Sequence, residues 1–168
     1  MINRPLMDAQ LTQHLCGLMA DLLIKKDWKL VTAESCTGGM ISAACTDLAG
    51  SSEWFERGFV TYSNAAKTEL LGVDGALLLR DGAVSESVAR AMVHGALDHS
   101  HAQVAVSVTG VAGPSGGSPA KPVGTVWFGL AVPRQMVTEV RHFDGDRAAV
   151  RVATVQHALR RLVELLEH

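Results

Sequence analysis

Basic clusters and long apolar runs are both missing from this sequence, and each absence excludes a class of protein. Lysine and arginine never occur in runs longer than two, and the net charge is −2. The chain therefore lacks the clusters of Lys and Arg that are typical of nucleic-acid-binding proteins. No apolar run reaches the roughly 18 residues of a membrane span. We expect a small-molecule or protein partner, with no nucleic acid and no membrane.

Cysteine is also scarce, and its spacing is uninformative. Cys16, Cys36 and Cys45 form no CxxC pair, and an odd number of thiols cannot all pair within the chain. Free thiols are typical of a reducing compartment, so we expect a cytoplasmic protein. A chain of 168 residues with 48% hydrophobic residues can bury one core without disulfides or metal. We predict a single domain spanning residues 1–168.

Helical and strand-like patterns alternate along the chain, which is typical of an α/β protein whose mostly parallel sheet is covered on both faces. The first predicted helix carries an apolar stripe of Met7, Leu11, Leu15, Leu18, Leu22 and Leu23. Residues 75–79 fit neither pattern. Helices are predicted over residues 7–26, 38–48, 64–71, 86–98 and 147–166, and strands over 29–33, 54–55 with 59–62, 103–108, 123–132 and 136–143.

Residues 32–39, with the sequence TAESCTGG, join a predicted strand to a predicted helix and are the strongest candidate for an active-site turn. The segment places hydroxyl and thiol side chains beside the backbone N–H groups of a helix N-terminus, which attract anions. The same residues would suit an ordinary connection, because Ser and Thr cap helices and Gly relieves backbone strain. The segment alone leaves both interpretations open.

Two further polar segments follow predicted strands. Tyr62-Ser63-Asn64, with Lys67 shortly after, follows the second strand, and the glycine-rich residues 109–117 follow the third. Ligands of α/β proteins gather at the carboxyl ends of the strands, so we expect all three segments to converge on one crevice. Glycine lets the backbone approach a ligand closely, although a flexible surface connection would have the same composition.

Basic side chains give two weaker signals. Arg147 and Arg151 lie one turn apart at the start of the last predicted helix, where the helix dipole disfavours a cation. An anionic ligand, a carboxylate partner or a solvated helix face would explain them. His94, His99 and His101 lie at or just after a predicted helix end. The dipole favours histidine there without any metal, and we predict no metal site.

Several motifs occur together in an order that resembles the CinA C-terminal domain family, from about residue 30 to the end of the last helix. Ordered motifs at compatible spacing are far more specific than any one of them. They are AESCTGG (33–39), GSS (50–52), VTYSN (60–64) with Lys67, GAVS (82–85), TGVAGP (109–114) with GG (116–117), KPVGTV (121–126) and GDR (145–147) with Arg151.

The resemblance implies a three-layer α/β/α sandwich with a mixed, mostly parallel sheet. It also implies an amidohydrolase that converts nicotinamide mononucleotide to nicotinic acid mononucleotide and ammonia by a Ser/Lys mechanism, without metal or organic cofactor, and that assembles as a homodimer. The alternative is a non-catalytic nucleotide-binding or regulatory member of the same family. The presence of Ser35, Tyr62 and Lys67 together favours the enzyme.

The resemblance makes Ser35 the nucleophile and Lys67 its base, with Tyr62 orienting Lys67 or relaying a proton. Cys36 is intrinsically the better nucleophile, but the resemblance favours Ser35 and leaves Cys36 to line the pocket. Backbone N–H groups of residues 37–39 would form the oxyanion hole, and the other residues would hold the nucleotide. The predicted substrate-binding set is Cys36, Thr37, Gly38, Gly39, Asn64, Thr109, Gly110, Gly113, Gly116, Gly117 and Arg147.

Overall fold

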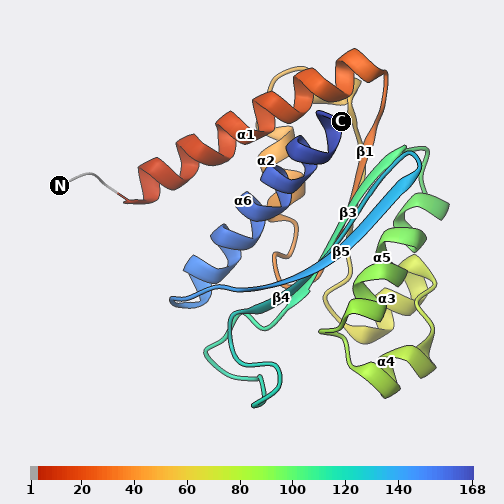
Figure 1. Ribbon diagram of the computed structural model, residues 1–168, viewed down its shortest axis with the longest axis vertical. Coiled ribbons are helices and arrows are strands. Elements are labelled where there is room, and N and C mark those ends of the chain that lie inside the picture. Colours follow the sequence, from red (N-terminus) through yellow and green to blue (C-terminus); the bar gives the residue numbers. More distant parts are fainter. Residues whose placement is uncertain (1–3) are drawn as a thin grey trace.

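A five-stranded sheet lies at the centre of the computed structural model, which describes residues 4–168, with side chains from Asp8 onward (Figure 1). The strand order is β2-β1-β3-β4-β5. β1 pairs in parallel with β2 and β3, whereas β4 is antiparallel to both of its neighbours, so four of the five strands run in one direction. The strands are β1 (Leu30–Glu34), β2 (Phe55–Val60), β3 (Val104–Gly110), β4 (Thr125–Val132) and β5 (Gln135–His142).

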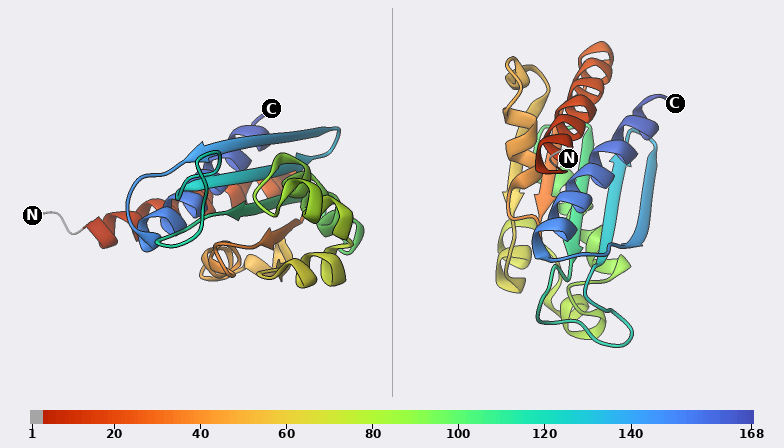
Figure 2. Two further views of the ribbon diagram at one scale, coloured as in Figure 1. Left: turned by 90° about the horizontal axis from the view of Figure 1, so that it is seen from below. Right: turned by 90° about the vertical axis from the view of Figure 1, so that its left-hand side faces the viewer.

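Helices cover both faces of the sheet, which confirms the three-layer α/β/α prediction (Figures 1 and 2). One face carries α1 (Arg4–Lys26), α2 (Met40–Thr46) and α6 (Arg147–Leu166), and the other carries α3 (Asn64–Leu71), α4 (Gly75–Asp81) and α5 (Glu86–Asp98). A short 3-10 helix, η1 (Ser51–Glu53), precedes β2. The sheet separates two apolar cores, one centred on Phe128 and Leu159 and the other on Met92 and Val93.

Side-chain caps fix several helix ends where the sequence predicted them. The hydroxyls of Ser63 and Ser85 accept from the backbone N–H groups of Ala66 and Val88. At the start of α6, the carboxylate of Asp146 accepts from the N–H of Ala149. These caps satisfy N–H groups that would otherwise lack a partner at the start of a helix.

Two segments differ from their predictions. Residues 75–81 form a helix because Asp74 caps it. The pattern was unclear because Leu79 is 90% exposed, so apolar residues do not mark the buried face. β2 runs without a break from Phe55 to Val60, whereas the prediction joined residues 54–55 to 59–62. Tyr62 therefore lies beyond the strand.

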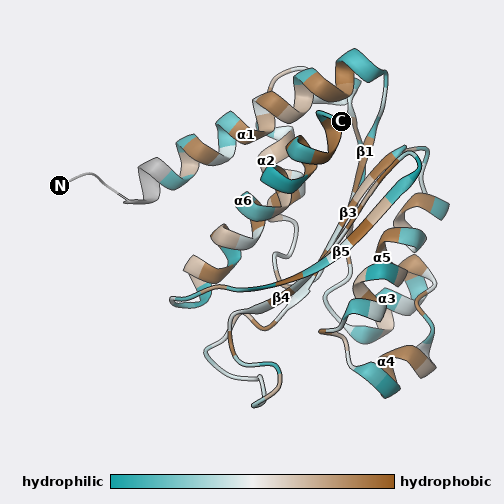
Figure 3. Ribbon diagram, in the orientation of Figure 1, coloured by the Kyte–Doolittle hydropathy of each residue, from teal (hydrophilic) through white to brown (hydrophobic). Residues whose placement is uncertain are grey.

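The buried stripe of α1 also differs from its prediction. Leu15, Cys16, Met19 and Leu23 are buried, whereas Leu11 and Leu18 are 37% and 40% exposed. Hydrophobic and hydrophilic stretches alternate along α1 in Figure 3. The side chain of the predicted Met7 lies outside the part of the chain that the structure describes. Among the described residues, no helix is both long and apolar enough to cross a membrane.

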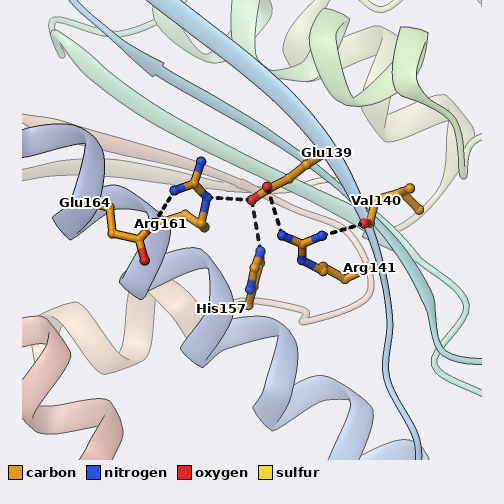
Figure 4. Close-up of polar contacts among 6 residues, drawn as sticks. All are labelled: Glu139, Val140, Arg141, His157, Arg161 and Glu164. Carbon is orange, nitrogen blue, oxygen red and sulfur yellow. Dashed lines mark hydrogen bonds and ion pairs between the residues drawn. The ribbon is translucent and has the colours of Figure 1, made fainter.

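A polar cluster joins β5 to α6 (Figure 4). Glu139 of β5 accepts from Arg161 of α6 at 3.0 Å, and its carboxylate also lies 2.9 Å from Nε2 of His157. The His157 ring packs edge-on against Phe128, with the ring centres 4.7 Å apart. The cluster therefore anchors the edge strand of the sheet to the long helix that carries Arg147 and Arg151.

Candidate active site

A cavity of about 250 Å³ lies at the carboxyl ends of β1, β2 and β3. All three segments that the sequence placed at this edge contribute to it, together with the turn before α5 and the start of α6. The convergence follows from the topology, because parallel strands bring their carboxyl ends to the same edge. The lining residues are Ser35, Cys36, Tyr62, Asn64, Lys67, Ala83, Val84, Thr109, Gly110, Ala112 and Arg147.

Ser35 and Lys67 form a buried pair at the base of this cavity. Nζ of Lys67 lies 3.0 Å from Oγ of Ser35 and donates a hydrogen bond to the carbonyl oxygen of Thr61 at 2.9 Å. Lys67 is 1% exposed although it is charged in its ordinary state. It lies in the first turn of α3, whose start is capped by Ser63.

Burial changes the protonation of Lys67. Removal from water penalises the ammonium form and lowers the pKa of Lys67 below its usual value, while the nearby Cys36 acts weakly in the other direction. No carboxylate within the described residues lies within 4 Å of the amine to form an ion pair. A neutral amine beside a serine hydroxyl is the arrangement that a serine–lysine hydrolase needs.

The environment of Cys36 makes its thiol a poor nucleophile. It is 6% exposed, and burial is the largest cause that raises the pKa of its thiol to about 11. The reactive form of cysteine is the thiolate, so at neutral pH Cys36 remains a thiol. Its side chain lines the cavity, as expected for a residue that shapes the pocket.

The turn of residues 35–39 is held by a buried carboxylate. Glu34 is fully buried and accepts hydrogen bonds from the hydroxyl of Thr37 at 2.7 Å and from the N–H of Ile41 at 2.8 Å. Its other oxygen accepts from the N–H and the hydroxyl of Ser42, at 3.0 and 2.8 Å. Glu34 thereby caps the start of α2, since neither Gly39 nor another side chain does so.

Tyr62 and Arg147 form the outer wall of the cavity. The Arg147 guanidinium donates to the hydroxyl of Tyr62 at 2.9 Å and to the carbonyl oxygen of Gly113 at 2.8 Å. Tyr62 is 61% exposed. The hydrogen bond that orients Lys67 goes to the carbonyl of Thr61, and the hydroxyl of Tyr62 accepts from Arg147 instead. A proton relay through Tyr62 stays a prediction.

The structure separates the predicted substrate-binding set into two groups. Cys36, Asn64, Thr109, Gly110 and Arg147 line the cavity. The others lie behind it or beside it: Thr37 is buried against Glu34, Gly38 and Gly39 form the turn, and Gly113, Gly116 and Gly117 belong to the loop after β3.

Backbone conformation accounts for two of the loop glycines. Gly116 and Gly117 adopt φ values of +83° and +84°, a left-handed region that favours glycine. Both are exposed. The glycine-rich composition therefore has a conformational cause that does not depend on a ligand.

The roles of Arg151, Ala83 and Val84 at this site were not predicted from the sequence. Arg151 donates to the carbonyl oxygens of Cys36 and Thr37, both at 3.1 Å, and Ala83 and Val84 line the cavity. The signal for Arg151 was its spacing of one turn from Arg147; the turn before α5 carried only the GAVS motif. Within residues 4–168, no three His, Cys, Asp or Glu side chains gather as a metal site would require.

Comparison with known proteins identifies the family. A model described as the CinA C-terminal domain matches residues 12–166. The chain belongs to the CinA C-terminal domain family. The resemblance inferred from the ordered motifs is thus confirmed, and the match includes every residue of the cavity.

Two of the most similar proteins are named as amidohydrolases. Nicotinamide-nucleotide amidohydrolase PncC of Enterobacter agglomerans is 56% identical over 144 residues, which cover 83% of this chain and 88% of that protein. PncC of Pseudomonas putida is 57% identical over 137 residues, covering 82% and 86% of the two chains. The crystal structure of competence damage-inducible protein A (ComA) from Klebsiella pneumoniae superposes with a TM-score of 0.90 at 39% identity, covering 94% and 98%.

Proposed function

We propose that this chain is a nicotinamide mononucleotide deamidase, which hydrolyses the exocyclic carboxamide to give nicotinic acid mononucleotide and ammonia. The observation that carries the proposal is the buried pair of Ser35 and Lys67, with 3.0 Å between Oγ and Nζ, inside a cavity of a CinA C-terminal domain. Two relatives at 56% and 57% identity are named nicotinamide-nucleotide amidohydrolases.

The proposed reaction starts from neutral Lys67, whose lowered pKa favours this form. Lys67 accepts the proton of Ser35 while Oγ attacks the carboxamide carbon, and the carbonyl oxygen becomes an oxyanion. The intermediate collapses, the carbon–nitrogen bond breaks, and Lys67 returns the proton to the departing ammonia. A water molecule then attacks the acyl-serine with Lys67 again as base, which releases the carboxylic acid and restores Ser35.

Arg147 is the proposed ligand of the substrate phosphate. It lines the cavity and is exposed on its outer wall. Arg151 donates to two backbone carbonyls and Lys121 donates to the carbonyl of Asp81, and neither lines the cavity. Guanidinium groups bind phosphate through paired hydrogen bonds, and Arg147 would exchange its contact with Tyr62 for such bonds.

The alternative is a nucleotide-binding or regulatory member without catalysis. The burial of Lys67 argues against it, because burying an unpaired amine costs stability and a binding module gains nothing from that cost. Assembly as a homodimer, a cytoplasmic location and the absence of a cofactor remain predictions.

The experiment is an ammonia-release assay on purified protein with excess chelator. Nicotinamide mononucleotide should yield equal amounts of ammonia and nicotinic acid mononucleotide, whereas free nicotinamide, which lacks the phosphate for Arg147, should react far more slowly. A folded protein that binds the nucleotide but releases no ammonia would support the regulatory alternative instead.

A further inference from the structure

The turn that follows β1 contains backbone donors whose directions are set by other contacts. The N–H of Ser35 donates to Val108 and that of Gly38 donates to the carbonyl of Ser35, both at 3.0 Å. The N–H groups of Cys36 and Thr37 have no acceptor in the described part of the chain. They directly follow the proposed nucleophile, where oxyanion donors are needed.

The carbonyls of the same peptide groups are all engaged. In a trans peptide, the C=O and the N–H point in opposite directions. The carbonyl of Ser35 accepts from Gly38, and that of Cys36 accepts from Nε of Arg151 at 3.1 Å. These contacts therefore direct the N–H groups of Cys36 and Thr37 away from the partners of their own peptide carbonyls.

Glu34 and Arg151 bind this turn through hydrogen bonds from two different elements. Glu34 holds the Thr37 side chain and the first N–H groups of α2 from within the protein. Arg151, on α6, holds the carbonyls of Cys36 and Thr37. Arg151 does not line the cavity, so its position suits holding the turn and does not suit touching the substrate.

We propose that Glu34 and Arg151 are positioning residues that hold this turn so that the N–H of Cys36, the residue of the turn after Ser35 that lines the cavity, is a preorganised oxyanion donor. The inference rests on the proposed function, because an oxyanion forms only if the amide is attacked. Donors that are already fixed need no reorganisation during the reaction, so their loss lowers kcat more than it changes substrate binding.

Arg151→Met tests the grip from α6, with Arg160→Met as the matched control on the exposed side of the same helix. We expect kcat to fall about 10- to 100-fold for Arg151→Met, which is less than the loss of about 10²–10³ when an oxyanion donor is removed outright. KM should change by less than about twofold. Arg151→Lys, which can still reach a carbonyl, should recover part of the rate.

Thr37→Val tests the grip from Glu34 without removing the buried carboxylate. It should lower kcat about 3- to 10-fold, and Thr37→Ser, which keeps the hydroxyl, should restore the rate. Thr46→Val is the matched control: it removes a hydroxyl of α2 that donates only to the carbonyls of Ser42 and Ala43, and it should leave kcat unchanged.

The outcomes separate this inference from the proposed function. Ammonia release by the wild type with the expected losses in kcat supports both. A higher KM with unchanged kcat for Arg151→Met would make Arg151 a substrate ligand and overturn the inference. If Arg151→Met and Thr37→Val lower the melting temperature but leave kcat unchanged, Arg151 and Glu34 only stabilise the fold, and the inference is overturned. Absence of ammonia from the folded wild type would overturn the proposed function and the inference with it.

Discussion

Glu34 and Glu139 are two carboxylates in contrasting environments. Glu34 is fully buried and accepts only from neutral groups, namely backbone N–H groups and the hydroxyls of Thr37 and Ser42. Glu139 is partly exposed and is surrounded by Arg141, His157 and Arg161 (Figure 4). The first fixes a turn and a helix start, whereas the second joins a strand to a helix by ion pairs.

The same contrast extends to the neighbouring lysine. Lys67 is buried without a carboxylate partner, which lowers stability and prepares a base. Around Glu139, burial acts to raise its pKa, but the hydrogen bonds and charges of His157 and Arg161 outweigh burial and leave the pKa below its usual value. Burial of Lys67 destabilises the fold and favours the form of the amine that catalysis needs, whereas the contacts of Glu139 stabilise the fold.

Lys67→Met gives the largest expected effect on activity. Removal of the base should lower kcat by about 10³-fold or more, while the melting temperature should rise because a buried polar amine is replaced by an apolar side chain. In the wild type, kcat/KM should rise with pH through the lowered pKa of Lys67, since only the neutral amine accepts a proton. An activity unchanged by Lys67→Met would show that Lys67 is not the catalytic base, and the burial of its amine would then have no catalytic reason.

Glu34→Gln should impair both activity and stability. Its amide group would face donors that now meet a carboxylate oxygen, which leaves buried donors unsatisfied at about 1–3 kcal/mol each. We expect a lower melting temperature and a kcat lower by about 10- to 100-fold. Denaturant unfolding and steady-state kinetics, both below the melting temperature, measure the two effects. A rate equal to that of the wild type would place Glu34 in the same structural category as Glu139.

Cys36 should alkylate slowly at neutral pH. Its pKa of about 11 leaves the thiol protonated, and the labelling rate by iodoacetamide should rise with pH as the thiolate forms. Mass spectrometry of the labelled peptide over a pH series measures this rate. Rapid labelling of Cys36 near pH 7 that parallels loss of activity would point to a catalytic thiolate.

Glu139→Gln should have the smallest effect on activity, within about twofold. Stability should fall by about 1.5–3 kcal/mol at neutral pH, the range of hydrogen bonds to charged groups. The pKa of Glu139 is lowered in the folded state, so its contribution is present above the unfolded value of about 4.5 and is lost as pH falls through the folded value. Unfolding of both proteins at two pH values checks the sign.

The positions of the reactive groups followed from the sequence, because the parallel strands β1, β2 and β3 had to bring Ser35, the Tyr62 segment and Thr109 to one edge. The contacts of Arg151 did not follow. They depend on how α6 packs across the sheet after the hairpin of β4 and β5, and helical spacing alone cannot distinguish Arg147, which lines the cavity, from Arg151, which holds the turn. The buried partners of Glu34 did not follow from the sequence either, because they depend on how the turn folds back onto the start of α2.

The assignment of Ser35 as nucleophile is tested most directly by ammonia release from nicotinamide mononucleotide by two neighbouring variants, Ser35→Ala and Cys36→Ala. The geometry of the Ser35–Lys67 pair and the raised pKa of Cys36 predict that Ser35→Ala abolishes release and that Cys36→Ala keeps most of it. Full activity of Ser35→Ala together with an inactive Cys36→Ala would contradict the assignment of the nucleophile.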